Sequence, residues 1–493
     1  MYDSFDLISI RRLSNIAIER SQYLKCTYAE FRFEKKREET IITKELNVAS
    51  IIDDTSLGYG VRVIYKDTWG FAAGNIFSDI AVISTVDKAF QIADALSSNN
   101  LFSVHLAKEN ACFGDYLSDF RINPFDVPLK EKIDYMIEVS SLLKSEKKIN
   151  MVTFSMDFIA EYKYLLTSIG TETVQKRLRS YPVYEACSLD KKIGNFITLT
   201  SESYPVGMGY EAIEGFDFLK QVKKTAEDLE EMSHAESVPS GQYDVVIDPS
   251  NLWLVIHETI GHATELDRIA GYEADFAGTS FATIDKLFKL KYGSSLVNVV
   301  ADRTQKYGLA TIGFDDEGVK SDQWHLIKEG ILVDYQYNRE IANRYNFPQS
   351  NGCSYADSWS SIPIQRMPNI SLLPGKENYT TKDLIGHISN GIYIVGDKSW
   401  SIDMQRLNFQ FTGQKFYKIK QGKITGMYKN VAYQGNTPTF WNDCQMLGGE
   451  KTYQLYGSFE CGKGQPEQSA PVSHGCPSAL FTNVTILNTE NEN

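Results

Sequence analysis

The spacing of apolar residues changes from helical to alternating early in the chain. Leu7, Ile10 and Leu13 recur on one helical face, and residues 28–33 then alternate apolar and polar side chains, as a half-buried strand does. Further patterns predict a hairpin at 60–65 and 69–72, helices at 84–96 and 129–147, and strands at 152–158 and 196–201. The first part of the chain therefore mixes helices with strands.

The clearest change in the sequence pattern follows a charged helical pattern at 211–233. Residues 234–241 are polar and contain Pro and Gly, which is typical of a linker. A strand at 243–247, a helix beginning at Asp248 and mostly short strands and turns come next. For 493 residues we expect two domains and an α+β fold. An N-terminal α/β domain would span 1–236, and a β-rich, barrel- or sandwich-like domain carrying a bulged helix would span 237–493.

Composition narrows the class of protein. The net charge of −13, from 63 acidic and 50 basic residues, disfavours nucleic acid as a partner. There is no signal peptide pattern and no run of about 18 apolar residues, so we expect no export and no membrane partner. Seven scattered cysteines are not a disulfide framework. These features predict a cytoplasmic protein, in which a cysteine is available as a thiolate ligand.

The segment His257-Glu258-Thr-Ile-Gly261-His262 carries the candidate chemistry. Two imidazoles and a glutamate on one helix can hold zinc and activate water. The histidines are five apart, which places them about 140° apart on a regular helix of about 3.6 residues per turn. A local bulge must absorb one residue, and Gly261 is where it costs least. Glu258 could then act as general base; the alternative is two unrelated histidines on a buried helix.

A catalytic zinc site needs a third protein ligand. The Gly-rich segment 459–476 could present a thiolate, although a buried inert cysteine is the alternative. Glu265 and Asp267 could orient the histidines or lie on a solvated face. A P-loop-like match at 457–463 lacks the required Ser/Thr and is interpreted as accidental. The candidates for the third ligand are Glu265, Asp267, His325, His474, Cys461 and Cys476, while His105, His234, His387 and also His325 have the surroundings of structural histidines.

These motifs together resemble the TldD/PmbA family of metallopeptidases, also called modulators of DNA gyrase, in its TldD-like, metal-bearing branch. The family signature HExxxHxxxxD matches the segment from His257 to Asp267. Other similar blocks lie at 60–64, 70–72, 167–171, 314–318, 366–369, 373–375 and 461–463. The likeness spans nearly the whole chain.

The resemblance implies that His257, His262 and Cys461 bind zinc and that Glu258 is the general base. It implies no other cofactor, and a His₂Cys set favours zinc among the first-row metals. Family members hydrolyse short or unfolded peptides, in peptide maturation or turnover, inside a closed chamber formed with a metal-free paralogue. We therefore expect a heterodimer, with a homodimer as the alternative, and an extended substrate paired with an exposed strand edge.

Three other functions are alternatives, of which only the first also satisfies the motif. A dipeptidyl-peptidase of the HExxGH type would take a carboxylate as third ligand, and a non-catalytic partner subunit or regulator of DNA gyrase would need no metal. The chain also departs from the family at 396–403, which is bulkier than the usual glycine-rich turn, and around 465–466 and Cys476. These departures bear on substrate preference, and the motif leaves the roles of His474 and Cys476 open.

Overall fold

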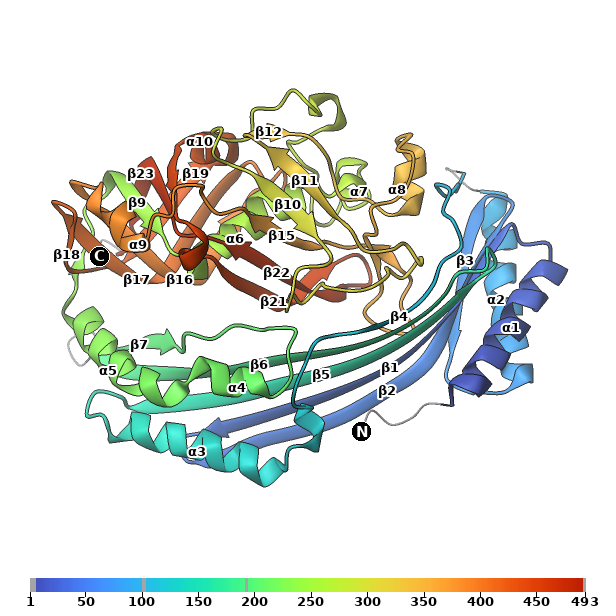
Figure 1. Ribbon diagram of the computed structural model, residues 1–493, viewed down its shortest axis with the longest axis horizontal. Helices are drawn as coiled ribbons and strands as arrows, with labels where there is room; N and C mark the ends of the chain where they lie inside the picture. The colour runs from blue at the N-terminus through green and yellow to red at the C-terminus, as the bar shows by residue number, and fades with distance from the viewer. Residues whose placement is uncertain (1–5, 100–102, 191–193, 491–493) are drawn as a thin grey trace.

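The computed structural model describes residues 6–99, 103–190 and 194–490. Its mixture of helices and strands confirms the predicted α+β class. A long curved sheet built from the N-terminal part supports the C-terminal part on one face, while helices pack near the two ends of the other face (Figure 1).

Very long strands form the N-terminal sheet, in the order β3-β2-β1-β5-β6-β4, with β7 also paired to β6. Only β4 runs parallel to its neighbour β6; the other pairs are antiparallel. The predicted hairpin at 60–65 and 69–72 is confirmed as the end of β2 and β3, whereas the predicted strands at 28–33 and 152–158 are only parts of longer ones. The bounds are β1 (Tyr28–Lys44), β2 (Asn47–Tyr65), β3 (Thr68–Gly74), β4 (Phe113–Leu117), β5 (Met151–Thr167), β6 (Glu172–Asp190) and β7 (Asn195–Thr200).

The N-terminal helices mostly match the sequence pattern. The helix predicted at 84–96 begins earlier, because the Ser78 side chain caps it by accepting from the Ala81 amide. The helix predicted at 211–233 is broken at Asp217, whose φ of 46° is left-handed and incompatible with a continuous helix. The bounds are α1 (Leu7–Tyr23), α2 (Asp79–Ser97), α3 (Leu129–Ser145), α4 (Glu211–Phe216) and α5 (Phe218–His234).

The first part of strand β1 is buried on both of its faces. Phe31 and Phe33 pack in the apolar cluster beneath α1 and α2. Glu30, Arg32 and Glu34 point the other way and are also buried, against the C-terminal part. The prediction of a half-buried strand was wrong here, because a charged sheet face can be buried where each charge finds a partner.

A closed five-stranded barrel forms the core of the C-terminal part, as the sequence predicted. It runs β16-β9-β23-β19-β17 and closes by pairing β17 with β16. A four-stranded sheet, β12-β11-β10-β15, and a β21–β22 hairpin lie beside it. The strands are β9 (Gly241–Ile247), β16 (Asn390–Ile402), β17 (Asn408–Lys420), β19 (Val431–Asn436), β23 (Ala479–Asn488), β10 (Val299–Asp302), β11 (Gln323–Lys328), β12 (Ile331–Leu332), β15 (Asn369–Leu372), β21 (Gln454–Lys463) and β22 (Gln468–Cys476).

Shorter elements complete this part of the molecule. Two of the minor strands, β13 and β14, form their own ladder, and the other three extend the barrel sheet. The short strands are β8 (Glu236–Ser237), β13 (Ser354–Tyr355), β14 (Ile364–Gln365), β18 (Lys423–Lys429) and β20 (Cys444–Leu447), and the helices are α6 (Pro249–Ile256), α7 (Leu266–Ile269), α8 (Arg339–Arg344), α9 (Thr381–Gly386) and α10 (Thr437–Asn442).

The polar stretch at 234–241 is not a free linker. Its Glu236 and Ser237 pair with β18, and Val238 is fully buried. A buried apolar side chain overrides the turn-forming composition of its neighbours. The division into domains at 236/237 stays a prediction.

Buried ion pairs join the N-terminal sheet to the loop after β10. Arg62 contacts Glu317 at 3.1 Å, and Lys163 contacts Asp316 at 2.8 Å. The acidic segment 315–317 therefore ties the barrel side of the molecule to the sheet, which fixes the space between them.

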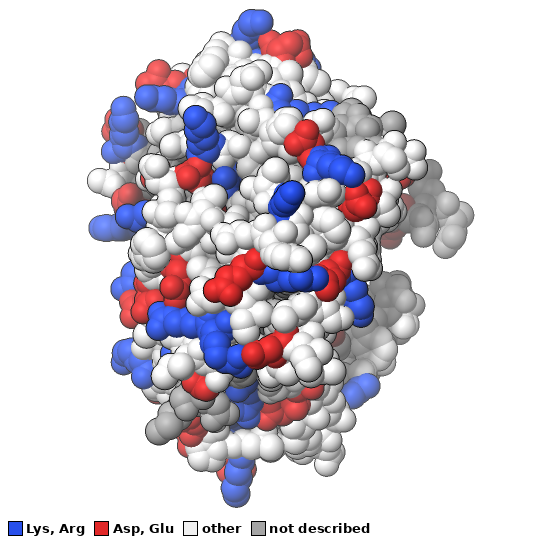
Figure 2. Space-filling model, turned by 90° about the vertical axis from the view of Figure 1, so that its right-hand side faces the viewer, with Lys and Arg blue, Asp and Glu red and all other residues white. Residues whose placement is uncertain are grey.

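On the face drawn in Figure 2, basic and acidic side chains are intermixed rather than sorted by sign. Within the described ranges, no helix combines the length and apolar character needed to cross a membrane.

Candidate active site

Helix α6 carries the HExxxH segment into the centre of the C-terminal core. It begins with Asp248, whose side chain accepts from the Ser250 amide at 3.0 Å, and with Pro249 in its first turn. Every residue of α6 except Ser250 is buried. Apart from Asn251, the buried residues of α6 are apolar, as expected for a helix surrounded by other elements.

A single π turn follows α6 and spans His257–Gly261. The amide of His262 donates to the carbonyl of His257, five residues back, so the turn absorbs the extra residue. The two imidazoles consequently face each other, with ring centroids 4.6 Å apart. The predicted bulge is confirmed as a structural feature.

Gly261 serves this turn for a different reason from the one expected. Its φ of −53° is open to any residue. A β-carbon there, however, would lie 2.6 Å from the sulfur of Met367. Close packing against the end of the Met367 side chain therefore favours glycine here, rather than an unusual backbone conformation.

A histidine from β22 orients His257. The Nδ1 of His474 lies 2.9 Å from the carbonyl oxygen of Ile370, which can only accept, so this nitrogen carries the proton. Burial, with the neighbouring histidines, holds the pKa of His474 well below its usual value, so its Nε2 is unprotonated and carries a lone pair. That Nε2 lies 2.8 Å from Nδ1 of His257, which therefore donates. The Nε2 of His257 is therefore left unprotonated, with a lone pair that can bind a metal.

A carboxylate orients His262 in a similar way. Glu265 accepts from Nδ1 of His262 at 2.7 Å, so Nε2 is the ring nitrogen left to bind a metal. Lys463 holds Glu265 at 2.8 Å and Asp267 at 2.8 Å. Burial raises the pKa of Glu265, but Lys463 and His262 outweigh it and keep the carboxyl ionised.

Cys461 completes the cluster from β21, two residues before Lys463 and on the same side of that strand. Its Sγ lies 3.7 Å from Nε2 of His262. The Arg366 guanidinium donates to the backbone carbonyl of Cys461. Burial opposes ionisation of the thiol, but His262 and Arg366 outweigh it and lower the pKa of Cys461.

The three donors fit a metal ion. One ligand atom from each of His257, His262 and Cys461 lies within 4.8 Å of the other two. Bond lengths of about 2.0–2.1 Å to nitrogen and about 2.3 Å to sulfur put tetrahedral donors about 3.6 Å apart. The 3.7 Å between Cys461 and His262 matches that value.

Glu258 lies beside this cluster and is held by Arg406. The guanidinium of Arg406 donates to Oε2 of Glu258 at 2.5 Å. Burial would raise the pKa of Glu258, but His262, His257 and Arg406 outweigh it and lower it. The carboxylate is therefore ionised and able to accept a proton.

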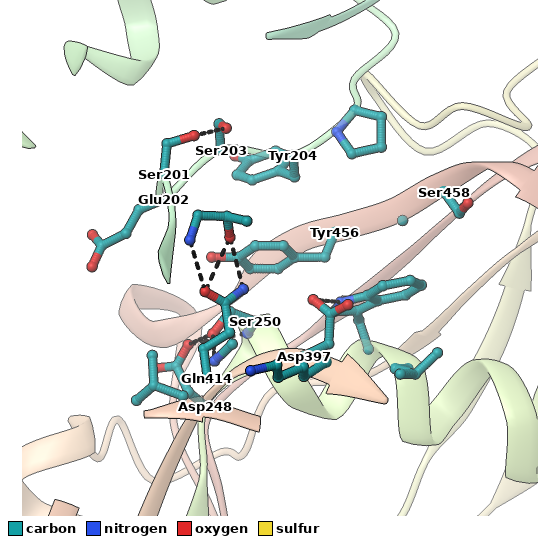
Figure 3. Close-up of a pocket in the computed structure, with 18 of the residues that line it drawn as sticks. Ser201, Glu202, Ser203, Tyr204, Asp248, Ser250, Asp397, Gln414, Tyr456 and Ser458 are labelled. Carbon is teal, nitrogen blue, oxygen red and sulfur yellow. Dashed lines mark hydrogen bonds between the residues drawn. The ribbon is translucent and has the colours of Figure 1, made fainter. Parts of the chain in front are cut away.

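His257 and Glu258 line a cavity of about 840 Å³ between the N-terminal sheet and the barrel. Tyr204 meets Tyr456 across it, with ring centroids 4.7 Å apart. Figure 3 shows Ser201 and Tyr204 on one side, with Asp397 and Tyr456 on the other. Glu258 is therefore reached from this cavity.

Two other candidates for the third ligand lie outside the donor cluster. Cys476 is buried with its Sγ 3.7 Å from the carbonyl of Pro249, and His325 lies on β11; neither belongs to the donor cluster. Among the described residues that cluster includes no carboxylate.

Sequence reasoning missed the roles of Arg366 and Arg406, because each reaches the site from a loop distant in sequence. For Lys463, the two-residue spacing from Cys461 was an available signal.

A buried donor triad, an adjacent ionised glutamate and an open cavity define the class of metal-dependent hydrolases. The description "PmbA/TldA metallopeptidase C-terminal domain" matches residues 240–488, and "PmbA/TldA metallopeptidase domain 1" matches residues 29–93. The chain belongs to the PmbA/TldD family and is a metallopeptidase.

Similar proteins span nearly the whole chain. A metalloprotease of Methanocaldococcus jannaschii is 27% identical over 448 residues, covering 91% of this chain and 94% of its own. A zinc metalloprotease TldD homolog of Saccharolobus solfataricus is 23% identical over 468 residues, covering 93% and 96%. The crystal structure of TldE from Thermococcus kodakarensis matches with a TM-score of 0.74 at 16% identity, covering 97% of this chain and 99% of TldE. A Thermotoga maritima structure described as a modulator of a DNA gyrase has a TM-score of 0.78 at 14% identity, covering 97% and 100%. These structures share the fold.

Proposed function

We propose that the chain is a zinc-dependent peptidase that hydrolyses short or unfolded peptide segments. The observation that carries the proposal is the His257, His262 and Cys461 donor cluster, placed next to Glu258 on the wall of the cavity. A soft thiolate with two imidazoles favours zinc. The zinc metalloprotease name of the Saccharolobus relative is consistent with this metal.

In this proposal His257, His262 and Cys461 hold the zinc ion. Bound zinc would acidify water and polarise the scissile carbonyl. Glu258 takes the proton from the attacking water and passes it to the leaving amine. His474 and Glu265 hold the two imidazoles in the required orientation, and Arg406 holds one carboxylate oxygen of Glu258, a residue that lines the cavity.

Strand β21 offers a binding surface for extended peptides. In the described structure it is hydrogen-bonded as a strand only to β22, and residues 456–460 line the cavity. A peptide that pairs with its open edge would be held by backbone hydrogen bonds, with loose sequence preference. The backbone groups of a short or unfolded segment are free for such pairing, whereas most of those in a folded substrate are already paired.

We further propose that a second chain closes the cavity into a chamber. The likeness to TldE supports a heterodimer with a metal-free paralogue, and a homodimer is the second arrangement. Copurification of the tagged chain from its own cells, followed by mass spectrometry of the complex, distinguishes the two.

The function is tested with unfolded peptides incubated with the zinc-loaded chain and with its Glu258→Gln variant. We expect the variant to bind zinc normally but to lose at least about 100-fold in hydrolysis, since proton transfer by a positioned base contributes about 10²–10⁴-fold. Equal hydrolysis by both proteins would contradict the role of Glu258. A zinc-loaded chain inactive both alone and with its copurified partner would contradict the peptidase proposal.

A further inference from the structure

A β-bulge in β16 directs a carboxylate into the cavity. The pairing of β16 with β17 shifts register between Asp397 and Trp400. Gly396, just before the bulge, has a φ of 72°, its amide donates to the Ser250 hydroxyl at 2.8 Å, and its carbonyl accepts from Asn251 at 2.9 Å. Bulges beside active sites commonly aim a side chain, and this one is held at both of its backbone groups.

Among the described residues, Asp397 has only neutral hydrogen-bond partners and no cationic one. The indole of Trp253 donates to one of its oxygens at 3.2 Å. Among the described residues no Lys, Arg or His pairs with Asp397 within 4.0 Å. Burial raises the pKa of this carboxyl, which reflects the absence of a compensating positive charge.

Asp397 also lies close to the reaction centre. Trp253 is one helical turn before His257, and their ring centroids are 6.3 Å apart. The same indole stacks on His474 at 6.1 Å. A substrate group bound to Asp397 would therefore lie near the proposed reaction centre.

The charged side chains in the rest of the cavity wall are also mostly negative. Acidic side chains outnumber basic ones seven to two among the lining residues. One of the two lysines, Lys415, is already paired with Glu202 at 3.2 Å and Asp228 at 3.0 Å. A concave surface of one sign concentrates ligands of the opposite sign.

We propose that Asp397 is a specificity-determining residue that binds an ammonium or guanidinium group of the peptide substrate. This inference rests on the proposed peptidase function and adds its substrate class, a cationic peptide segment. The group is either a lysine or arginine side chain or the free amino terminus.

Peptide binding tests the inference without relying on turnover. The full-length Glu258→Gln chain is titrated with fluorescent alanine-rich octapeptides carrying one lysine, moved through each position, or norleucine at the same position. Each peptide is made with a free and with an acetylated amino terminus. We expect a lysine position, or the free terminus, to tighten binding about tenfold, as a charge-assisted hydrogen bond does.

Asp397→Asn keeps the shape of the side chain and the bond to Trp253 but removes the charge. It should reduce the cationic preference, whether for lysine over norleucine or for the free over the acetylated terminus, to within about twofold while leaving the affinity for the acetylated norleucine peptides unchanged. Asp275→Asn, an exposed carboxylate outside the cavity, should leave the preference intact.

Absence of any cationic preference, its survival in Asp397→Asn, or no peptide binding would overturn the inference. The proposed function fails separately: preferential binding by a chain that never hydrolyses peptides would contradict the peptidase and support Asp397. Hydrolysis without charge preference would contradict only the role of Asp397.

Discussion

The Nε2 atom of His474 lies 2.8 Å from Nδ1 of His257, and the other ring nitrogen of His474 lies 2.9 Å from the carbonyl oxygen of Ile370. This chain of bonds fixes one tautomer in each ring. It leaves the Nε2 lone pair of His257 directed toward His262 and Cys461. The neutral imidazole of His474 thus orients His257, as the carboxylate of Glu265 orients His262.

Replacing His474 should weaken the metal site without removing a ligand. His474→Ala frees the His257 ring to rotate or change tautomer, and loss of such a partner typically costs 10–100-fold in metal affinity. Competition against a chromogenic chelator measures the effect, with His325→Ala as the control outside the donor cluster. Equal zinc affinity in wild type and His474→Ala would contradict this role.

Replacing Lys463 should destabilise the whole fold. Lys463→Met leaves Glu265 and Asp267 buried without their shared cation, and breaking a buried ion pair in this way costs about 3–5 kcal/mol. Urea unfolding of the metal-free protein measures the loss. The exposed Lys451→Met is the control, and a loss below about 1 kcal/mol in Lys463→Met would count against the buried network.

Replacing Gly261 tests the packing behind the π turn. A β-carbon at this position would approach the Met367 sulfur to 2.6 Å, so Gly261→Ala should cost about 1–3 kcal/mol by overpacking. The cost should shrink when Met367 is also truncated to alanine, because the two sites are in contact. Additive losses in this double-mutant cycle would show that the glycine is needed for another reason.

Replacing Arg406 should slow catalysis more than substrate binding. Arg406→Gln releases Oε2 of Glu258 and lets the carboxylate leave its position, so we expect kcat to fall at least about tenfold with KM and zinc content little changed. Arg406→Lys, which keeps the charge, should recover part of the loss. A variant with unchanged kcat, or one that loses its zinc, would contradict the positioning role.

The site was predictable where its chemistry is local in sequence. The five-residue spacing of His257 and His262 requires a bulge, and the π turn supplies it. The fold class and the barrel followed from the pattern of short strands after 241. Cys461 became a preferred ligand only through the family resemblance, since spacing alone left six candidates.

The partners of the site were not predictable, because tertiary contacts bring them from distant segments. His474 lies 217 residues from His257, and Arg406 lies 148 residues from Glu258. For a related reason the charged positions of β1 suggested solvent exposure. They are buried instead, because the barrel side of the molecule supplies matching charges.

The most direct test of the metal site is the zinc content of the purified wild-type chain beside Cys461→Ser, measured by elemental analysis. Cys476→Ser is the matched control, because Cys476 is equally buried but lies outside the donor cluster. We predict about one zinc per chain in the wild type and in Cys476→Ser, and a sharp reduction in Cys461→Ser. Full zinc retention in Cys461→Ser, or a wild-type chain that takes up no zinc when it is offered, would contradict the His257, His262 and Cys461 site.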